Sequence, residues 1–300
     1  MATGQAEVKP SNGVLGAEVS GVDWGGGVED DTIAMLRRAW LDHQVLIFRK
    51  QELSPERLIA LGRAFGDLEV VETFSGLSGH PQIMPLVKEA TDTLNVGEGW
   101  HIDSTYRECP PAGAVLYSVD VPPVGGDTLF ASMYAAHEAL SPGMKRLVGG
   151  LRMVHANGYL GDAAALEDRR SGLAMPVRTD VRVRTAEHPL VTRHPETGRS
   201  VLFVNGMVAD GGMTSHLVDM TAEESAPVIR YLCAHASRAE FTLRVEWEPG
   251  MVVLYDNRCL QHNAPNDYQG HRREMWRLSL AGGVPAGHPG PGADPTGTER

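Results

Sequence analysis

The sequence is poor in cysteine and has no long apolar run. Its three cysteines, Cys109, Cys233 and Cys259, are widely spaced and form no CxxC pair, so neither a disulfide framework nor a thiolate zinc site is predicted. No apolar run reaches the ~18 residues that a transmembrane helix needs, and the first residues lack the basic and apolar segments of a signal peptide. We therefore expect a cytoplasmic protein that contacts no membrane.

Lysine is also scarce, and acidic residues are in excess. The chain has only four lysines, and 27 basic residues against 38 acidic ones give a formal net charge of -11. A surface of this charge repels nucleic acid, which is itself anionic. We expect no nucleic-acid partner and a small molecule as the substrate.

Apolar residues are plentiful enough for a large core, at 42% of 300 residues. In the first hundred residues, helical patterns begin at about Asp31 and at Ser54, which is followed by Pro55. Beyond residue 100 the pattern changes to short β-rich runs separated by turn signals, with a helix that opens in capping-box spacing at Thr221. This pattern predicts a mainly β fold with flanking helices, either an antiparallel barrel or a sandwich.

No internal repeat or domain boundary is visible in the sequence. We expect one domain over residues 1–283 and a disordered tail over residues 284–300, which are rich in glycine and proline. Residues 161–185 combine mixed charge with small side chains and are predicted to form a lid or an insertion.

The stretch GEGWHIDSTY, residues 97–106, contains a candidate pair of metal ligands. His101 and Asp103 are two residues apart, and on a strand such residues point to the same face, where both can bind one metal ion. The spacing alone is weak evidence, because His194 and Glu196 share it within HPETGR, which is typical of a polar hairpin turn. A third ligand is therefore needed.

The candidate third ligand is His262, in LYDNRCLQHNAP, just past the apolar run MVVLYDN. Two histidines and one carboxylate form the facial triad of non-haem Fe(II) oxygenases, which leaves coordination positions open for co-ligands. Zinc binds the same side chains, so a zinc hydrolase is an alternative. A β-barrel binding module without catalysis is a second alternative.

Two arginines and a threonine indicate a site for an acidic co-ligand. Arg273 and Arg277, in HRREMWRLSL, are four residues apart and would share one face of a strand. The planar fork of arginine suits the far carboxylate of a dicarboxylate co-substrate, and Thr128, in VGGDTLFAS, is a candidate hydroxyl for the same anchor. For Arg277 the alternative is a structural ion pair with Glu98 or Glu274.

Several segments together carry a resemblance to a known family. WHIDSTY, GGDTLFAS, HPETGRSVLFVN, YDNRCLQHNAPNDY and RREMWRLSL occur in this order. From about Gly13 to Gly283 the chain resembles the taurine dioxygenase and 2,4-dichlorophenoxyacetate dioxygenase family of Fe(II)/2-oxoglutarate-dependent enzymes. The resemblance implies a double-stranded β-helix, or jelly roll, and a reaction that consumes 2-oxoglutarate and O2 and releases succinate and CO2.

The resemblance also implies roles for individual residues. His101, Asp103 and His262 match the iron ligands of the family. Thr128 and Arg273 match the residues that hold the distal carboxylate of 2-oxoglutarate, and Arg277 matches an arginine near the anionic end of the substrate. Relatives of this kind commonly form dimers or tetramers, so a homo-oligomer is compatible with the resemblance.

Two departures from the family pattern concern the substrate. Gly97 stands where the taurine enzyme has an asparagine, and residues 206–217 form a longer rim loop, rich in glycine and methionine, without the aromatic residue that binds taurine. An enlarged apolar rim predicts a mainly apolar substrate that carries a carboxylate.

These departures make the chain look similar to aryloxypropionate dioxygenases and to oxygenases that tailor natural products, such as the sesquiterpenoid lactone pentalenolactone. The predicted reaction is oxidation of an unactivated C–H bond in such a molecule. Degradation of an aryloxyalkanoate or a sulfonate is the alternative function.

Overall fold

The computed structural model describes residues 5–71, 75–157, 184–205 and 215–287, and the structural statements below concern these residues. The expected lid at 161–185 and the expected rim loop at 206–217 lie mostly outside these ranges, as do residues 288–300 of the expected tail. None of the described helices is both long enough and apolar enough to cross a membrane.

A large sheet forms the centre of the molecule. Its strands follow the order β1-β2-β3-β13-β6-β15-β4, with β5 pairing with β15 as well. Neighbouring strands are antiparallel except β2 and β3, which are parallel. The strands are β1 (Glu7–Pro10), β2 (Ala17–Ser20), β3 (Val45–Phe48), β4 (Leu68–Glu69), β5 (Met84–Lys88), β6 (Gly113–Asp120), β13 (Val252–Asp256) and β15 (Arg273–Leu280).

A three-stranded sheet packs against the inner face of the large sheet. It consists of β12 (Thr242–Val245), β7 (Thr128–Ser132) and β14 (Leu260–Asn263), in this order. One apolar cluster joins the two sheets, and in it Phe130 of β7 contacts Tyr255 of β13, with ring centroids 5.3 Å apart. Two facing sheets around a shared core confirm the predicted jelly roll.

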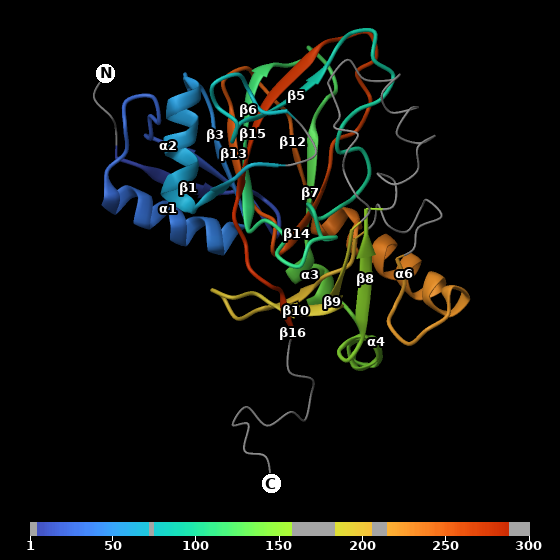
Figure 1. The fold of residues 1–300 in the computed structure, drawn as a ribbon. Coiled ribbons are helices and arrows are strands. Elements are labelled where there is room, and N and C mark those ends of the chain that lie inside the picture. Colours follow the sequence, from blue (N-terminus) through green and yellow to red (C-terminus); the bar gives the residue numbers. More distant parts are fainter. Residues whose placement is uncertain (1–4, 72–74, 158–183, 206–214, 288–300) are drawn as a thin grey trace.

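Two helices cover the outer face of the large sheet, where they lie side by side in Figure 1. They are α1 (Asp30–His43) and α2 (Pro55–Phe65). Trp40 and Phe65 are buried there and contact each other edge to face. The Ser54 hydroxyl accepts a hydrogen bond from the backbone N–H of Arg57, so the start of the helix predicted from Ser54 and Pro55 is confirmed.

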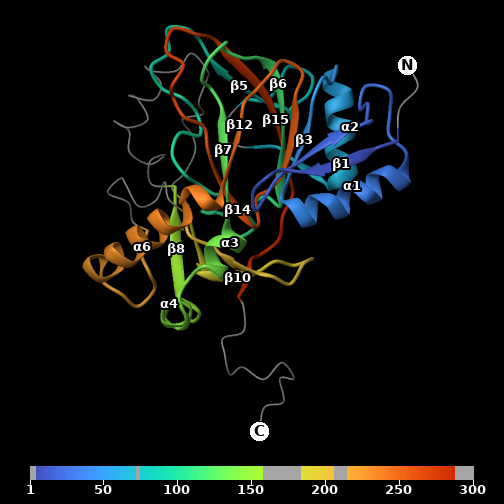
Figure 2. The ribbon, with the colours of Figure 1, turned by 180° about the vertical axis from the view of Figure 1, so that it is seen from behind.

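The remaining elements gather at the other end of the molecule, as the reverse view in Figure 2 also shows. The predicted capping box at Thr221 and Glu224 is present at the start of the longest helix there, whereas the short helix α3 after β7 was not predicted. The elements are α3 (Met133–Glu138), α4 (Pro142–Val148), α6 (Ala222–Ala236), the 3-10 helix η3 (Ala239–Phe241), β8 (Arg152–Ala156), β9 (Thr185–Pro189), β10 (Val191–Arg193), β11 (Ser200–Leu202) and β16 (Ala286–Gly287). β16 belongs to the segment expected to be a tail, and it pairs with β10.

Candidate active site

His101 and His262 lie next to each other, joined through their backbones, with their rings tilted by 47°. The N–H of each residue donates to the carbonyl oxygen of the other, and both distances are 2.9 Å. Their imidazole centroids are 4.1 Å apart. His262 lies in β14, a strand of its own that the sequence pattern did not predict, because the run LQHN has little apolar character.

The expectation of a continuous strand through His101 and Asp103 is wrong. His101 forms a single bridge, and Asp103 begins a turn in which Ser104 has φ 50°. The side chain of Asn257 holds the backbone of Asp103 instead, because its Oδ1 accepts from the Asp103 N–H at 2.9 Å and its Nδ2 donates to the Asp103 carbonyl at 3.3 Å. An amide side chain therefore takes the place of a neighbouring strand.

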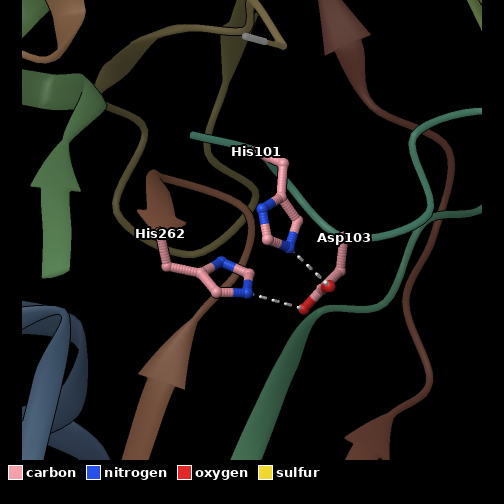
Figure 3. Close-up of side chains that lie close together, drawn as sticks. All are labelled: His101, Asp103 and His262. Carbon is pink, nitrogen blue, oxygen red and sulfur yellow. Dashed lines mark ion pairs between the residues drawn. The ribbon is translucent and has the colours of Figure 1, made fainter. Parts of the chain in front are cut away.

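The three predicted ligands converge, and Figure 3 shows both imidazoles pointing toward the carboxylate. The Nε2 atom of His101 is 3.7 Å from Oδ1 of Asp103, and the Nε2 atom of His262 is 3.7 Å from Oδ2. All three candidate ligand atoms lie within 4.8 Å of one another, and all three residues are buried. The geometry therefore brings together the residues that the sequence proposed from two distant segments.

Both imidazoles are prepared to act as neutral ligands. Nδ1 of His101 lies 2.8 Å from the Gly99 carbonyl oxygen, and because a carbonyl only accepts, the proton is on Nδ1 and the lone pair on Nε2. Burial lowers the pKa of His101. Burial, followed by the neighbouring His101, lowers the pKa of His262 to about 3. Each ring can therefore offer an unprotonated nitrogen.

The carboxylate of Asp103 is held in its ionised form. Burial would raise the pKa of Asp103, but Arg277 and the two imidazoles outweigh it, and the net shift is downward. Oδ2 accepts from Arg277 Nη2 at 2.6 Å and from the Tyr255 hydroxyl at 2.7 Å. Two neutral imidazoles and one carboxylate suit a divalent metal ion with open coordination positions.

Two contacts of this carboxylate were not predicted from the sequence. Arg277 forms its ion pair with Asp103 rather than with Glu98 or Glu274, and Glu274 pairs with Arg272. The hydroxyl of Tyr255 comes from the interior of the apolar strand β13. In the sequence, this contact was indicated by a tyrosine within an apolar run, because a buried hydroxyl needs a hydrogen-bond partner.

Thr128 and Arg273 lie on β7 and β15, one in each of the two facing sheets. The Thr128 oxygen accepts from the Trp247 indole N–H at 3.0 Å, which leaves the hydroxyl proton available to a ligand. A Cβ atom on Gly126, two residues earlier, would lie 3.3 Å from Cδ of Arg273. Arg273 and Arg277 are both buried, and their alternating positions on β15 place them on one face, as predicted.

Gly97 leaves space beside one candidate ligand. Its φ is +87°, a backbone conformation that favours glycine. A Cβ atom built there would lie 3.6 Å from Cε1 of His101 and 4.0 Å from its Nε2. The absence of a side chain at this position therefore keeps the metal-facing edge of His101 open.

A second group of candidate ligands, His194, Asp256 and Cys259, is fully occupied by internal contacts. His194 Nδ1 accepts from the backbone N–H groups of Glu196 and Thr197, while Nε2 donates to Asp256 at 3.1 Å. The turn between β10 and β11 thus uses both ring nitrogens, and the prediction of a hairpin turn at HPETGR is confirmed.

Comparison with known proteins identifies the family. A family model described as taurine catabolism dioxygenase TauD, TfdA family, matches residues 7–279. The chain belongs to this family. It is 31% identical over 296 residues to an alpha-ketoglutarate-dependent sulfate ester dioxygenase of Pseudomonas putida, a match that covers 94% of this chain and 92% of the relative.

Two further comparisons agree with the TauD/TfdA family. The chain is 33% identical over 291 residues to the (S)-phenoxypropionate/alpha-ketoglutarate-dioxygenase of Sphingobium herbicidovorans, covering 92% of this chain and 95% of that one. The crystal structure of a taurine dioxygenase from Burkholderia xenovorans superposes with a TM-score of 0.78 at 34% identity, covering 96% of this chain and 95% of the other.

Membership of the TauD/TfdA family confirms the enzyme class and the cofactors. Alpha-ketoglutarate is another name for 2-oxoglutarate. The chain is therefore a 2-oxoglutarate-dependent oxygenase, and it uses Fe(II) and O2 to oxidise a small-molecule substrate. The alternatives of a zinc hydrolase and of a binding module without catalysis gain no support from these relatives.

Proposed function

We propose that His101, Asp103 and His262 hold the Fe(II) ion of this oxygenase. The observation that carries the proposal is the convergence of three buried ligand atoms within 4.8 Å. The tautomer of His101, fixed by the Gly99 carbonyl, and the ionised state of Asp103 both support it. Iron bound there would couple the decarboxylation of 2-oxoglutarate by O2 to the oxidation of a C–H bond.

Thr128 and Arg273 are proposed to hold the distal carboxylate of 2-oxoglutarate. Arg273 is 5% exposed, and its Nε has no hydrogen-bond partner in the described part of the chain. A buried guanidinium with an unused donor is suited to bind a carboxylate with two parallel hydrogen bonds. The Thr128 hydroxyl has a proton to donate, because its oxygen accepts from the Trp247 indole N–H.

The substrate proposed for this active site is a mainly apolar small molecule with a carboxylate, and an unactivated C–H bond is oxidised. Gly97 leaves room beside His101, and Arg277 lies buried on the same face as Arg273 with its Nε unpartnered among the described residues. Phenoxypropionate, the substrate named for one relative, combines an apolar ring with a carboxylate.

We further propose that residues 1–283 form the catalytic domain.

A sulfate ester is the second candidate substrate, favoured by the Pseudomonas putida relative. A sulfate ester with an apolar body shares its anionic end with an aryloxyalkanoate. Arg277 could therefore bind the sulfate group or the carboxylate. The sesquiterpenoid lactone expected from the sequence gains no support from these relatives.

The first experiment tests the iron site under anaerobic conditions. Wild-type protein and His101→Ala are titrated with Fe(II) and then with 2-oxoglutarate, and visible absorption is recorded. We expect a weak metal-to-ligand charge-transfer band in the wild type only. Its absence from folded, iron-loaded wild type, or its persistence in His101→Ala, would contradict the proposed ligands.

A second experiment identifies the substrate class. Succinate release is measured with phenoxypropionate, a medium-chain alkyl sulfate and taurine, each with and without O2. We expect oxygen-dependent stimulation that is strongest with the apolar carboxylate. Stimulation by taurine alone would refute the proposed apolar substrate, and preference for the alkyl sulfate would establish the second candidate.

A further inference from the structure

Lys88 lies buried beside Arg273, although nothing in the local sequence marks it as a site residue. It is the last residue of β5, and its register partner in the antiparallel strand β15 is Arg273. Side chains of such partners point to the same face of a sheet and lie close together. Lys88 is 2% exposed, so two cationic side chains stand next to each other inside the protein.

In the part of the chain that the structure describes, no carboxylate forms an ion pair with either cation. Lys88 Nζ also has no hydrogen-bond partner there. The nearby Asp127 is paired with Arg244 instead. The unused donor capacity therefore includes the whole ammonium group of Lys88 and Nε of Arg273.

Tyr268 connects the two cations. Lys88 Nζ lies 4.7 Å from the centre of the Tyr268 ring, within the range of a cation–π contact. The phenol lies close enough to Arg273 to interact with its charge, and its hydroxyl donates to Asn95 Oδ1 at 3.0 Å. The ring thus holds both charged groups in place without neutralising either of them.

Burying two adjacent cations is costly unless an anion joins them. An unpaired buried charge strongly destabilises a fold, and a second like charge nearby adds to the cost. A cation–π contact offsets only a small part of this cost. The arrangement is therefore suited to a carboxylate that enters from outside and lies between the two side chains.

We propose that Lys88 is a second cationic ligand for the distal carboxylate of 2-oxoglutarate, acting together with Arg273 and Thr128. The inference rests on the proposed co-substrate site and adds a residue to it. The guanidinium fork can engage both carboxylate oxygens, and the ammonium group supplies a compact charge to one of them. Lys88 thereby favours 2-oxo acids with a second negative charge over those with a neutral end.

The test uses Lys88→Met, which keeps the length of the side chain and removes its charge, in the full chain. Binding of 2-oxoglutarate is measured anaerobically by the charge-transfer band with Fe(II) and by calorimetry. Loss of one buried charged contact should weaken 2-oxoglutarate binding about tenfold or more, with Fe(II) affinity unchanged. The matched control is Lys145→Met, whose Nζ donates to the Glu138 carbonyl on α3, away from the site.

Two further variants make the result decisive. Lys88→Arg restores the charge and should recover part of the affinity, while Lys88→Gln gives a second neutral side chain if Lys88→Met folds poorly. Wild-type affinity for 2-oxoglutarate in either folded neutral variant would overturn the inference and leave Lys88 as a structural partner of Tyr268. Wild-type affinity in Arg273→Leu would instead refute the co-substrate site proposed above.

Discussion

Arg277 and Tyr255 donate hydrogen bonds to the same oxygen of Asp103, at 2.6 Å and 2.7 Å. The two donors come from β15 and β13, so the carboxylate is fixed from two strands of the large sheet. Groups that orient a metal ligand commonly contribute to metal affinity. The position of Asp103 therefore depends on residues that do not themselves belong to the ligand triad.

Replacing Tyr255 by phenylalanine should weaken iron binding without removing a ligand. The substitution deletes one of the two hydrogen bonds to Oδ2, and loss of such an outer contact typically lowers metal affinity about 10- to 100-fold. Anaerobic Fe(II) titration measures the change. Tyr117→Phe is the control, because the Tyr117 hydroxyl donates to the Gln51 carbonyl, away from the ligands. Equal affinities for wild type and Tyr255→Phe would show that the contact is dispensable.

Asn257→Ala should destabilise the fold as well as the metal site. The buried amide accepts from the N–H of Asp103 and donates to the Pro111 carbonyl at 2.8 Å. Alanine leaves both groups without a partner, at a cost of about 2 kcal/mol or more. Chemical denaturation measures the free energy of unfolding, with Asn266→Ala as the control, because the half-buried Asn266 makes a solvent-exposed hydrogen bond to the Thr93 carbonyl. A change below about 0.5 kcal/mol would refute the proposed bracing role.

Gly97→Asn should narrow the space beside His101. The new side chain would begin 3.6 Å from Cε1 of His101, so succinate release with phenoxypropionate should fall more than release with a small acid. Gly79→Asn is the matched control, since Gly79 also has a positive φ, of 78°, and a Cβ atom placed there would meet nothing within 4 Å. An equal loss for both substrates would show that backbone strain, and not crowding, causes the effect.

His155 should make the protein sensitive to acid. Burial, and then neighbouring His188, lower the pKa of His155 from 6.5 to about 3. Between about pH 3 and pH 6.5, His155 therefore binds a proton in the unfolded chain but not in the folded protein. The free energy of unfolding then falls between pH 6.5 and about 3, by up to about 1.4 kcal/mol per pH unit.

The variant His155→Asn should reduce this pH dependence by about one proton. Denaturation curves are collected across the same pH range, and the slope of the free energy of unfolding against pH is compared with that of wild type. The exposed His271→Asn is the control. If His155→Asn keeps the slope of wild type, other groups cause the acid sensitivity.

Local signals predicted some of the helix starts, because a capping residue contacts only the first turn of its own helix; the short helix α3 was not predicted. Ser54 and Thr221 cap the helices whose starts they marked, and the alternating pattern placed Arg273 and Arg277 on one face. His101, Asp103 and His262 were proposed because two separate motifs had a joint chemical meaning.

The unpredicted parts depend on contacts between distant segments. β5 has the sequence MPLVK, whose proline argues against a strand, and its partner β15 lies far along the chain. The position of Lys88 beside Arg273 follows only from that pairing. The Tyr255 contact with Asp103 likewise joins residues with no common sequence pattern. Periodicity and motif spacing describe neighbours along the chain. They do not show which residues of two distant strands pair with each other.

The paired backbone hydrogen bonds of His101 and His262 join segments that are synthesised at different times. More than half of the polypeptide separates the two residues, and β14 is made late. A nascent chain that ends before β14 contains Asp103 and the first imidazole, but neither the second imidazole nor the strand that steadies the first. If these residues hold the iron, the full set of ligands exists only after β14 has been made, so the proposed site would bind iron after that point in synthesis.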